Sequence, residues 1–406
     1  MANRIKRIIG REILNAKGNP TVEAMLETDD GYVAVASVPA GTSTGTYEAC
    51  ALYDGGSRYG GKGTLKAAAN VSGPINNLLQ GRELSNQFEL DCLMNQLDGT
   101  DTKSRLGANA ILATSVAIAK AKALCQHKEV FQTLTSATGY RIPDAIATVI
   151  AGGSFGISGL EFEDYLYILH GFDKFSDELE ALVMMRKRLE KNLCKIYGTI
   201  PEDGGALAPP LKCSDDAFDI MLQTAKECGY EKNVDLGIDA AISEQYDKVS
   251  GLYHVREGLD RQGLCDYYVE LARKYPLTYF EDCFDEDDIE GFLLLKKALP
   301  NVQNVGDDLF TSNLKRLEAY HGVANGLLLK INQIGTVSEA IASAEYAKEH
   351  GIDVTVSLRS GETTDDFIAD LAVALSARQI KLGSPVRAER NVKYNRLLYI
   401  ATVLGV

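Results

Sequence analysis

Two different hydrophobic patterns divide the chain. Near the N-terminus, apolar and polar residues alternate in 21–28 and again in 32–38, and the Asp-Asp-Gly of residues 29–31 is a hairpin signal between them. Residues from about 64 to 126 favour helices, and residues 108–121 are almost wholly apolar, which is typical of a buried helix. Together these elements predict an α+β lobe of about 135 residues.

Beyond about residue 140 the pattern changes to short apolar runs separated by amphipathic helices. The eight runs begin at Ile146, Tyr165, Val234, Leu277, Val302, Gly326, Asp353 and Gln379. Eight strands with mostly helical connections over about 265 residues predict a parallel α/β barrel. A doubly wound open sheet is the alternative fold, but it would need a GxGxxG turn after its first strand, which the sequence lacks.

The change of pattern also predicts the domain organisation. The segment 140–144, Tyr-Arg-Ile-Pro-Asp, has the composition of a linker. We therefore expect an N-terminal α+β capping domain over residues 1–137 and a barrel domain over residues 138–406.

Composition and charge exclude several classes of protein. The 406 residues are 45% hydrophobic and 24% charged, which argues against disorder. With 42 basic and 56 acidic residues the net charge is −14, so a broad surface for nucleic acid or an anionic membrane is not expected. Neither a secretory leader nor a run of ~20 apolar residues is seen, which favours a soluble cytoplasmic protein. The chain contains only five histidines.

Charged residues stand at the ends of six consecutive predicted strands. They are Asp239, Glu281-Asp282, Asp307-Asp308, Lys330, Arg359-Ser360 and Lys381. A single charged strand end is usually a solvated rim. Six in a row favour a site at the carboxyl ends of the barrel strands, where side chains of such barrels converge on substrate.

The residue types at these strand ends form a chemically consistent set. Asp239, Glu281 and Asp307 are hard oxygen ligands without imidazole or thiolate, and this set suits Mg²⁺. The two lysines and the arginine would bind an anionic substrate, and Arg359 could grip a phosphate or carboxylate through two parallel hydrogen bonds. A lysine crowded by cations can lose its proton near neutral pH and act as a base. The set predicts removal of a proton next to a carboxylate, with a metal-stabilised intermediate.

Several segments, in order from about residue 10 to 400, resemble the enolase family. They begin at Lys17 (KGNPTVE), Thr42 (TSTG), Leu97 (LDGT), Leu106 (LGANAIL), Gly306 (GDDL), Gly326 (GLLLKINQIGT), Ser357 (SLRSGET) and Gln379 (QIK). The resemblance implies an enolase-like fold, a small α+β lobe capping a (β/α)8 barrel whose second strand runs antiparallel to the first. Use of a Lys or His base with one or two Mg²⁺ ions is an established property of this superfamily.

The resemblance also implies the metal site. Asp239, Glu281 and Asp307 fall on the family's metal ligands. Ser43, in the Gly-Thr-Ser-Thr-Gly loop that begins at Gly41, falls on the serine that closes over a second metal. Two Mg²⁺ ions per active site are therefore implied, the second arriving with the substrate.

Roles toward the substrate follow in the same way. Lys330 falls on the general base, and Lys381 on the lysine that contacts the substrate carboxylate. Arg359 and Ser360 fall on the phosphate grip. Asp203, in Glu-Asp-Gly-Gly, falls on a glutamate that assists departure of the hydroxyl.

The sequence departs from the family pattern on one side of the site. Phe155 and Leu358 stand where the family has its two active-site histidines. Glu163 and Asp164 align with a Gln-Glu pair, so that Asp164 and Asp203 are each one methylene shorter than the family's glutamates. We expect Glu163, Phe155 and Leu358 to shape the substrate pocket and Asp164 to take part in catalysis.

These departures lead to a hypothesis about the substrate. The base, the metal ligands and the phosphate grip are kept, whereas the side that handles the hydroxyl and the carboxylate changes. An ionised Glu163 would repel a substrate carboxylate. We therefore expect an enolase-like carbon–oxygen lyase whose substrate, a phosphorylated or phosphonate three-carbon acid, or whose second half-reaction has changed. A genuine enolase interconverting 2-phosphoglycerate and phosphoenolpyruvate is the first alternative, and a non-catalytic binding or scaffold protein is the second.

The family resemblance implies a homodimer or a dimer-based octamer.

Overall fold

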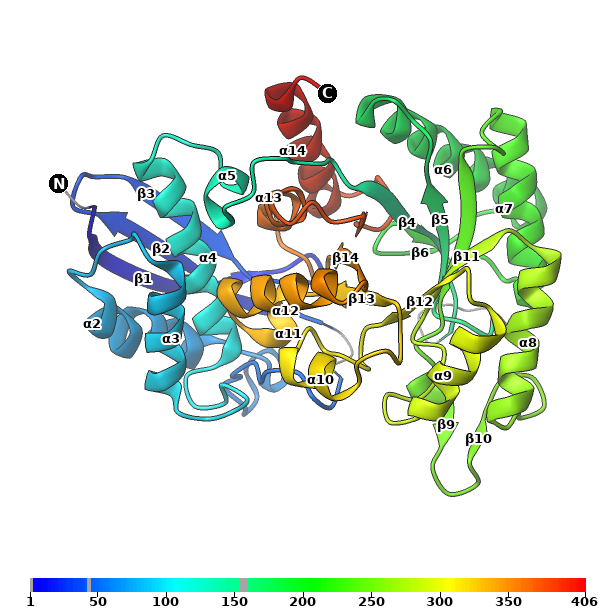
Figure 1. Ribbon diagram of the computed structural model, residues 1–406, viewed down its shortest axis with the longest axis horizontal. Coiled ribbons are helices and arrows are strands. Elements are labelled where there is room, and N and C mark those ends of the chain that lie inside the picture. Colours follow the sequence, from blue (N-terminus) through cyan, green and yellow to red (C-terminus); the bar gives the residue numbers. More distant parts are fainter. Residues whose placement is uncertain (1–2, 42–44, 154–158) are drawn as a thin grey trace.

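The computed structural model describes residues 3–41, 45–153 and 159–406, and it shows a small sheet with helices at one end and a larger barrel at the other (Figure 1). Strands β1 (Ile5–Leu14), β2 (Pro20–Thr28) and β3 (Val33–Ser37) form an antiparallel sheet in that order. The predicted hairpin is β2 and β3, with Gly31 at a φ of 86° in the turn. Strand β1 was not predicted, because only its residues Ile5 and Ile8 are buried and it shows no regular alternation.

Helices cover one side of this sheet. They are α1 (Leu65–Asn70), the π-helical turn Val71–Ile75, α2 (Asn76–Leu79), α3 (Gln87–Asp98), α4 (Ala108–Cys125) and α5 (Phe131–Leu134). Helix α4 packs against β2 and β3, as its apolar sequence predicts. Among the described helices α4 alone is long and apolar enough for a membrane span, but 72% of it is buried inside the protein, so it is a core helix.

Eight strands close into a barrel. They are β4 (Asp144–Ala151), β5 (Asp164–Leu169), β8 (Val234–Asp239), β11 (Leu277–Glu281), β12 (Gln303–Gly306), β13 (Gly326–Leu329), β14 (Asp353–Ser357) and β15 (Gln379–Lys381). They pair in chain order, and β15 pairs with β4 to complete the ring. Each of the eight predicted runs overlaps one of these strands, which confirms the enolase-like α/β barrel with its capping lobe.

The direction of one strand corrects the all-parallel barrel that the sequence pattern predicted. Strand β5 runs antiparallel to both β4 and β8, as the resemblance implied. The connection between β4 and β5, residues 152–163, holds no α-helix among its described residues. A parallel return from β4 would usually use an α-helical crossover.

The remaining α-helices follow the barrel strands along the chain. They are α6 (Phe175–Tyr197), α7 (Ser214–Cys228), α8 (Arg261–Lys274), α9 (Ile289–Ala298), α10 (Leu314–Ala319), α11 (Ile331–Ile334), α12 (Val337–Glu349), α13 (Phe367–Ala374) and α14 (Ala388–Leu404).

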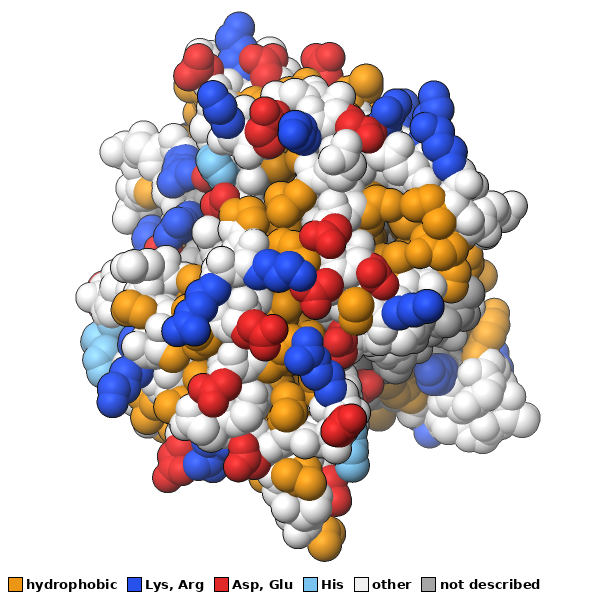
Figure 2. Space-filling model, turned by 90° about the vertical axis from the view of Figure 1, so that its right-hand side faces the viewer, with side chains coloured by type: hydrophobic (Ala, Val, Ile, Leu, Met, Phe, Trp, Pro, Cys, Tyr) orange, Lys and Arg blue, Asp and Glu red, His pale blue; other side chains and the backbone are white. Residues whose placement is uncertain are grey.

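On the barrel side turned toward the viewer in Figure 2, acidic and basic side chains are interspersed with apolar patches. That face therefore presents no continuous basic surface among its described residues.

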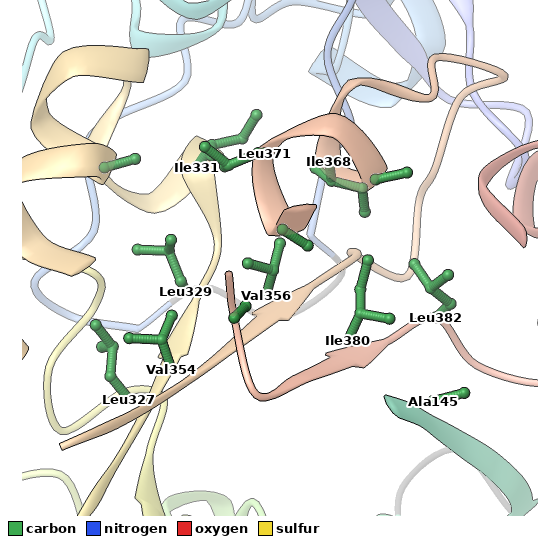
Figure 3. Close-up of a cluster of buried hydrophobic side chains, with 14 of the residues drawn as sticks. Ala145, Leu327, Leu329, Ile331, Val354, Val356, Ile368, Leu371, Ile380 and Leu382 are labelled. Carbon is green, nitrogen blue, oxygen red and sulfur yellow. The ribbon is translucent and has the colours of Figure 1, made fainter. Parts of the chain in front are cut away.

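Successive side chains of a barrel strand point to opposite faces, and packing on both faces fixes the position of the strand end. Leu328 of β13 points to the interior, where it packs in a small cluster with residues such as Ile168 and Val305. Its neighbours Leu327 and Leu329 belong to the larger outer core, which includes Ile368 of α13 (Figure 3). Because both faces of the strand are packed, the residue that follows it is held rigidly at the carboxyl end of the barrel.

The segment between α5 and β4, residues 135–143, has no helix or strand. We propose that it separates the capping domain, residues 1–137, from the barrel domain, residues 138–406.

Candidate active site

A cavity of about 130 Å³ opens where the barrel strands end at their carboxyl side. The ionisable groups that line it are Glu48, Glu163, Asp164, Asp203, Asp239, Asp282, Asp307, Asp308, Lys330, Arg359, Lys381 and Arg390. With eight acidic and four basic side chains, the lining carries four formal negative charges in excess. Leu358 and Ser360 also line it, so the structure brings most of the predicted site residues together.

Lys381 stands at the centre of the first acidic group. Its Nζ lies 2.7 Å from Asp239 Oδ2, 2.9 Å from both carboxylate oxygens of Glu281 and 3.9 Å from Asp164 Oδ2. Strand pairing produces this arrangement, because Asp239 lies opposite both Asp164 and Glu281 in register. The antiparallel direction of β5 places its first residue, Asp164, among the last residues of the parallel strands.

Burial and charge set the protonation of this group. Burial and the nearby Asp239 carboxylate raise the pKa of Glu281 well above its usual range. Burial also pushes the pKa of Asp239 upward, but the ammonium of Lys381, a hydrogen bond with Glu281 and the ammonium of Lys330 together hold that pKa below the ordinary value. The pKa of Asp164 rises to about 6, with burial as the largest cause. The raised pKa values of Glu281 and Asp164 indicate that Lys381 alone does not offset the negative charge of these carboxylates.

Lys330 and Asp307 form the second group. The Lys330 ammonium pairs with Asp307 Oδ2, and Gln333 Nε2 donates to Asp307 Oδ1 at 2.7 Å. Burial lowers the pKa of Lys330, but the Asp307 and Glu281 carboxylates together keep that pKa above its ordinary value. Lys330 is thus held protonated as long as this ion pair persists.

Two more carboxylates crowd beside Asp307. Ligand oxygens of Asp282, Asp307 and Asp308 lie within 4.8 Å of one another. Asp282 accepts hydrogen bonds from the backbone N–H groups of Asp307, at 2.9 Å, and Asp308, at 2.8 Å. Burial and the Asp307 charge raise the pKa of Asp308 to about 8, and burial and Asp308 raise that of Asp282. Such crowding favours a bound cation. The sequence places Asp282 and Asp308 next to predicted ligands, but nothing in it distinguished them.

Arg359 reaches the cavity from the end of β14 and pairs with a residue of the N-terminal lobe. Its Nη1 lies 2.9 Å from Glu48 Oε2, and its Nη2 lies 3.2 Å from Glu48 Oε1. Asn332 Oδ1 accepts a further hydrogen bond from Nη1 at 3.2 Å. Both charged side chains are buried. Glu48 was missed in the sequence because no local pattern distinguishes it, and only the fold brings it to Arg359.

Asp203 lies at the rim, in a hairpin of strands β6 (Glu202–Asp203) and β7 (Ala206–Leu207). Lys17 of the N-terminal lobe reaches over the rim, and its Nζ lies 3.5 Å from Asp203 Oδ1. The two lobes thus meet at the same cavity, with Lys17 and Glu48 contributed by the smaller one.

Comparisons with known proteins agree with this geometry. The family model "Enolase, N-terminal domain" matches residues 5–134, and "Enolase, C-terminal TIM barrel domain" matches residues 139–406. A Methanopyrus kandleri protein named Enolase is 44% identical over 98% of this chain and 95% of its own length. Proteins of the same name from Methanocaldococcus jannaschii and Pyrococcus furiosus are each 43% identical, over 99% and 97% of this chain and 96% and 93% of their own.

The chain belongs to the enolase family. It is accordingly an enzyme, a carbon–oxygen lyase related to phosphopyruvate hydratase.

The positions that depart from the enolase pattern have definite surroundings where the structure describes them. Glu163 is half-buried, and loss of solvent contact together with the charges of Asp239 and Asp164 raises its pKa well above the ordinary value. A protonated Glu163 is neutral and would not repel a substrate carboxylate. Leu358 lines the cavity and packs partly against the core. Phe155 and the predicted metal ligand Ser43 lie outside the described residues.

Proposed function

We propose that this enolase-family protein is a genuine, Mg²⁺-dependent enolase that interconverts 2-phosphoglycerate with phosphoenolpyruvate and water. The proposal rests on the convergence of Lys330, Arg359 and the acidic groups on one cavity, in a chain that resembles proteins named Enolase along nearly its whole length. The comparisons support this reaction better than the changed substrate that the sequence departures suggested.

The residues present fit magnesium. Asp239, Glu281 and Asp307 offer carboxylate oxygens, the ligands that Mg²⁺ prefers. The carboxylates that crowd this cavity support two Mg²⁺ per site, the second arriving with substrate and with Ser43. When bound, magnesium would stabilise the negative charge that develops on the carboxylate as the enolate forms.

The protein's own side chains bind the substrate and transfer the protons. Arg359 and Ser360 hold the phosphate, and Lys381 faces the carboxylate. Lys330 Nζ takes the proton from C2, once its ion pair with Asp307 is relieved. Asp203 gives a proton to the hydroxyl on C3, which leaves as water, and the C2–H electrons become the new double bond. Burial is the main cause that raises the pKa of Asp164 to about 6, so this carboxyl can take up a proton beside the site as the pH falls toward 6.

A direct assay tests the proposal. The purified protein is mixed with 2-phosphoglycerate and Mg²⁺, and the ultraviolet absorbance of phosphoenolpyruvate is followed. We expect turnover in the range of ordinary enzymes, on the order of 1–10³ s⁻¹. Lack of turnover, with the protein folded and Mg²⁺ in excess, would reject the proposal.

A changed substrate remains the second candidate, because an apolar side chain, Leu358, lines the cavity where the family pattern has a histidine. A phosphonate analogue of 2-phosphoglycerate offered in parallel separates the two. The second candidate predicts that the analogue is turned over with a higher kcat/KM than 2-phosphoglycerate.

Assembly and location remain predictions. We expect a cytoplasmic homodimer or a dimer-based octamer that binds neither nucleic acid nor membranes, and light scattering on the purified protein measures the assembly.

A further inference from the structure

The hairpin that carries Asp203 is too small to hold itself in place. Its strands pair only Glu202 with Leu207 and Asp203 with Ala206. It joins the barrel through one register pair, Ile150 with Leu207. Because so small a hairpin gains little from strand pairing, the side chains packed against it help to set the position of Asp203.

Arg186 of α6 lies directly beneath this hairpin. Its Nε and Nη2 donate to the backbone oxygen of Gly205 at 3.1 and 2.8 Å, and Nη2 also donates to Glu202 Oε1 at 2.7 Å. The side chain is only 1% exposed, and Nη1 donates to Glu190 Oε2 at 3.0 Å. Burying an arginine is costly unless its donors are satisfied, and here three of the four hydrogen bonds go to the hairpin.

Two further arginines confine the hairpin. Arg387 Nη2 donates to Glu202 Oε2 at 2.5 Å. Arg390 packs so closely over Gly204 that a Cβ atom there would collide with its Nη2. Gly204 has a φ of 54°, which glycine adopts readily. The turn next to Asp203 is therefore held from two sides.

We propose that Arg186 is a positioning residue for Asp203, acting through the Gly205 carbonyl and the Glu202 carboxylate on either side of it. This rests on the proposed function, in which Asp203 gives a proton to the leaving hydroxyl. A misplacement of ~1 Å can cost ~10²-fold in rate. A lysine could pair with Glu202, but it lacks the planar fork that reaches Gly205 with two N–H groups.

The two half-reactions provide the readout. Lys330 removes the C2 proton, whereas Asp203 acts only when the hydroxyl leaves. In D₂O, deuterium entering C2 of 2-phosphoglycerate reports the first step, and phosphoenolpyruvate reports both. We expect Arg186→Lys to slow phosphoenolpyruvate formation by about 10–100-fold. Deuterium exchange and the KM for 2-phosphoglycerate should stay close to those of the unaltered enzyme, because Lys330 and the phosphate grip are not touched.

Matched variants complete the experiment. Arg188→Lys is the control, since Arg188 lies on the same helix, is 37% exposed and pairs with Glu227 Oε2 at 2.6 Å away from the hairpin. It should behave as the unaltered enzyme. Glu202→Gln removes the carboxylate that both Arg186 and Arg387 contact, without altering a core residue. It should change the ratio of exchange to dehydration in the same direction, by less, and it tests the proposal if Arg186→Lys does not fold.

The unaltered enzyme is assayed first, which separates this inference from the proposed function. No turnover of 2-phosphoglycerate at that stage rejects the proposed function and the inference with it. If the enzyme turns over, equal loss of exchange and dehydration in Arg186→Lys, in parallel with a lower Tm, would show a merely structural role and overturn the inference. Unchanged kinetics in that variant, or in Glu202→Gln when it is the variant that folds, would overturn it as well.

Discussion

At the residue scale, the charged strand ends were predictable, but their partners were not. The sequence pointed to Lys330, Arg359 and Lys381 because each follows a run of apolar residues in a barrel strand. It gave no sign that Glu48 would pair with Arg359, since these residues lie 311 positions apart and meet only through the packing of two lobes. The protonation of Glu163 likewise depends on burial, which the linear sequence does not show.

Removing the proposed base should stop the reaction at its first step. In Lys330→Ala we expect kcat to fall by about 10²–10⁴-fold or more, because no other described amine occupies that position to take the C2 proton. Deuterium exchange at C2 should fall with it. The exposed Lys315→Ala on α10 is the control, and a rate in Lys330→Ala equal to that of the control would remove Lys330 as the base.

Changing the proposed phosphate grip should mainly affect binding. Arg359→Lys keeps the charge but loses the fork that can hold phosphate through two parallel hydrogen bonds. We expect the KM for 2-phosphoglycerate and the inhibition constant of inorganic phosphate each to rise about 10–100-fold, the loss of one or two charge-assisted hydrogen bonds. The exposed Arg378→Lys should leave both constants unchanged. An unchanged phosphate constant in Arg359→Lys would contradict this role.

At the scale of elements, strand positions followed from the hydrophobic pattern and strand direction did not. Each apolar run became a strand because its residues are buried on both faces, as in β13. The antiparallel course of β5 goes with a connection from β4 that has no α-helix among its described residues. The same direction brings Asp164 to the site, which the rule of charged strand ends could not have found, because Asp164 begins its strand.

The contact between α6 and β4 predicts a pH dependence of stability. Glu178 of α6 is 4% exposed and accepts a hydrogen bond from the backbone N–H of Ala145, while burial raises its pKa from 4.5 to about 7. Because the pKa is raised in the folded state, the contribution of Glu178 to stability is fully present below pH 4.5 and is lost as the pH rises to about 7. The loss is on the order of 3 kcal/mol.

Glu178→Gln should therefore be more stable than the unaltered protein above this pH range and should gain nothing below it. Tm measured across the range checks this expectation, with the exposed Glu180→Gln on the same helix as the control. A difference in Tm that does not change with pH would contradict it.

At the scale of the whole molecule, the site exists only where the two lobes meet. Glu48 and Lys17 come from the N-terminal lobe, and their partners, Arg359 and Asp203, come from the barrel. A further contact ties the lobes together, in which Lys120 of α4 pairs with Asp365 at 2.8 Å. Ligands that fill this cavity should therefore stabilise the molecule as a unit.

Ligand-dependent melting tests that expectation and the non-catalytic alternative together. At about 100 times its Kd, a ligand adds about 2.7 kcal/mol to stability. We expect Mg²⁺ with phosphoenolpyruvate to raise the Tm by a few degrees, roughly as such a gain implies. Chelation of Mg²⁺ should remove the rise, and Asp307→Asn should lack it. A binding or scaffold protein without this site would show no Mg²⁺-dependent shift.

The sequence by itself determined which residues can form strands, which helix is buried and which side chains stand at the strand ends, because these depend on local alternation and on residue type. Motif order was enough to indicate the enolase family. Tertiary structure decided the rest. Strand direction followed from a connection, Lys381 was placed among carboxylates by strand register, and Arg186 was buried under the hairpin of Asp203. Protonation states were decided there as well, since a pKa depends on burial and on charges brought close from distant parts of the chain.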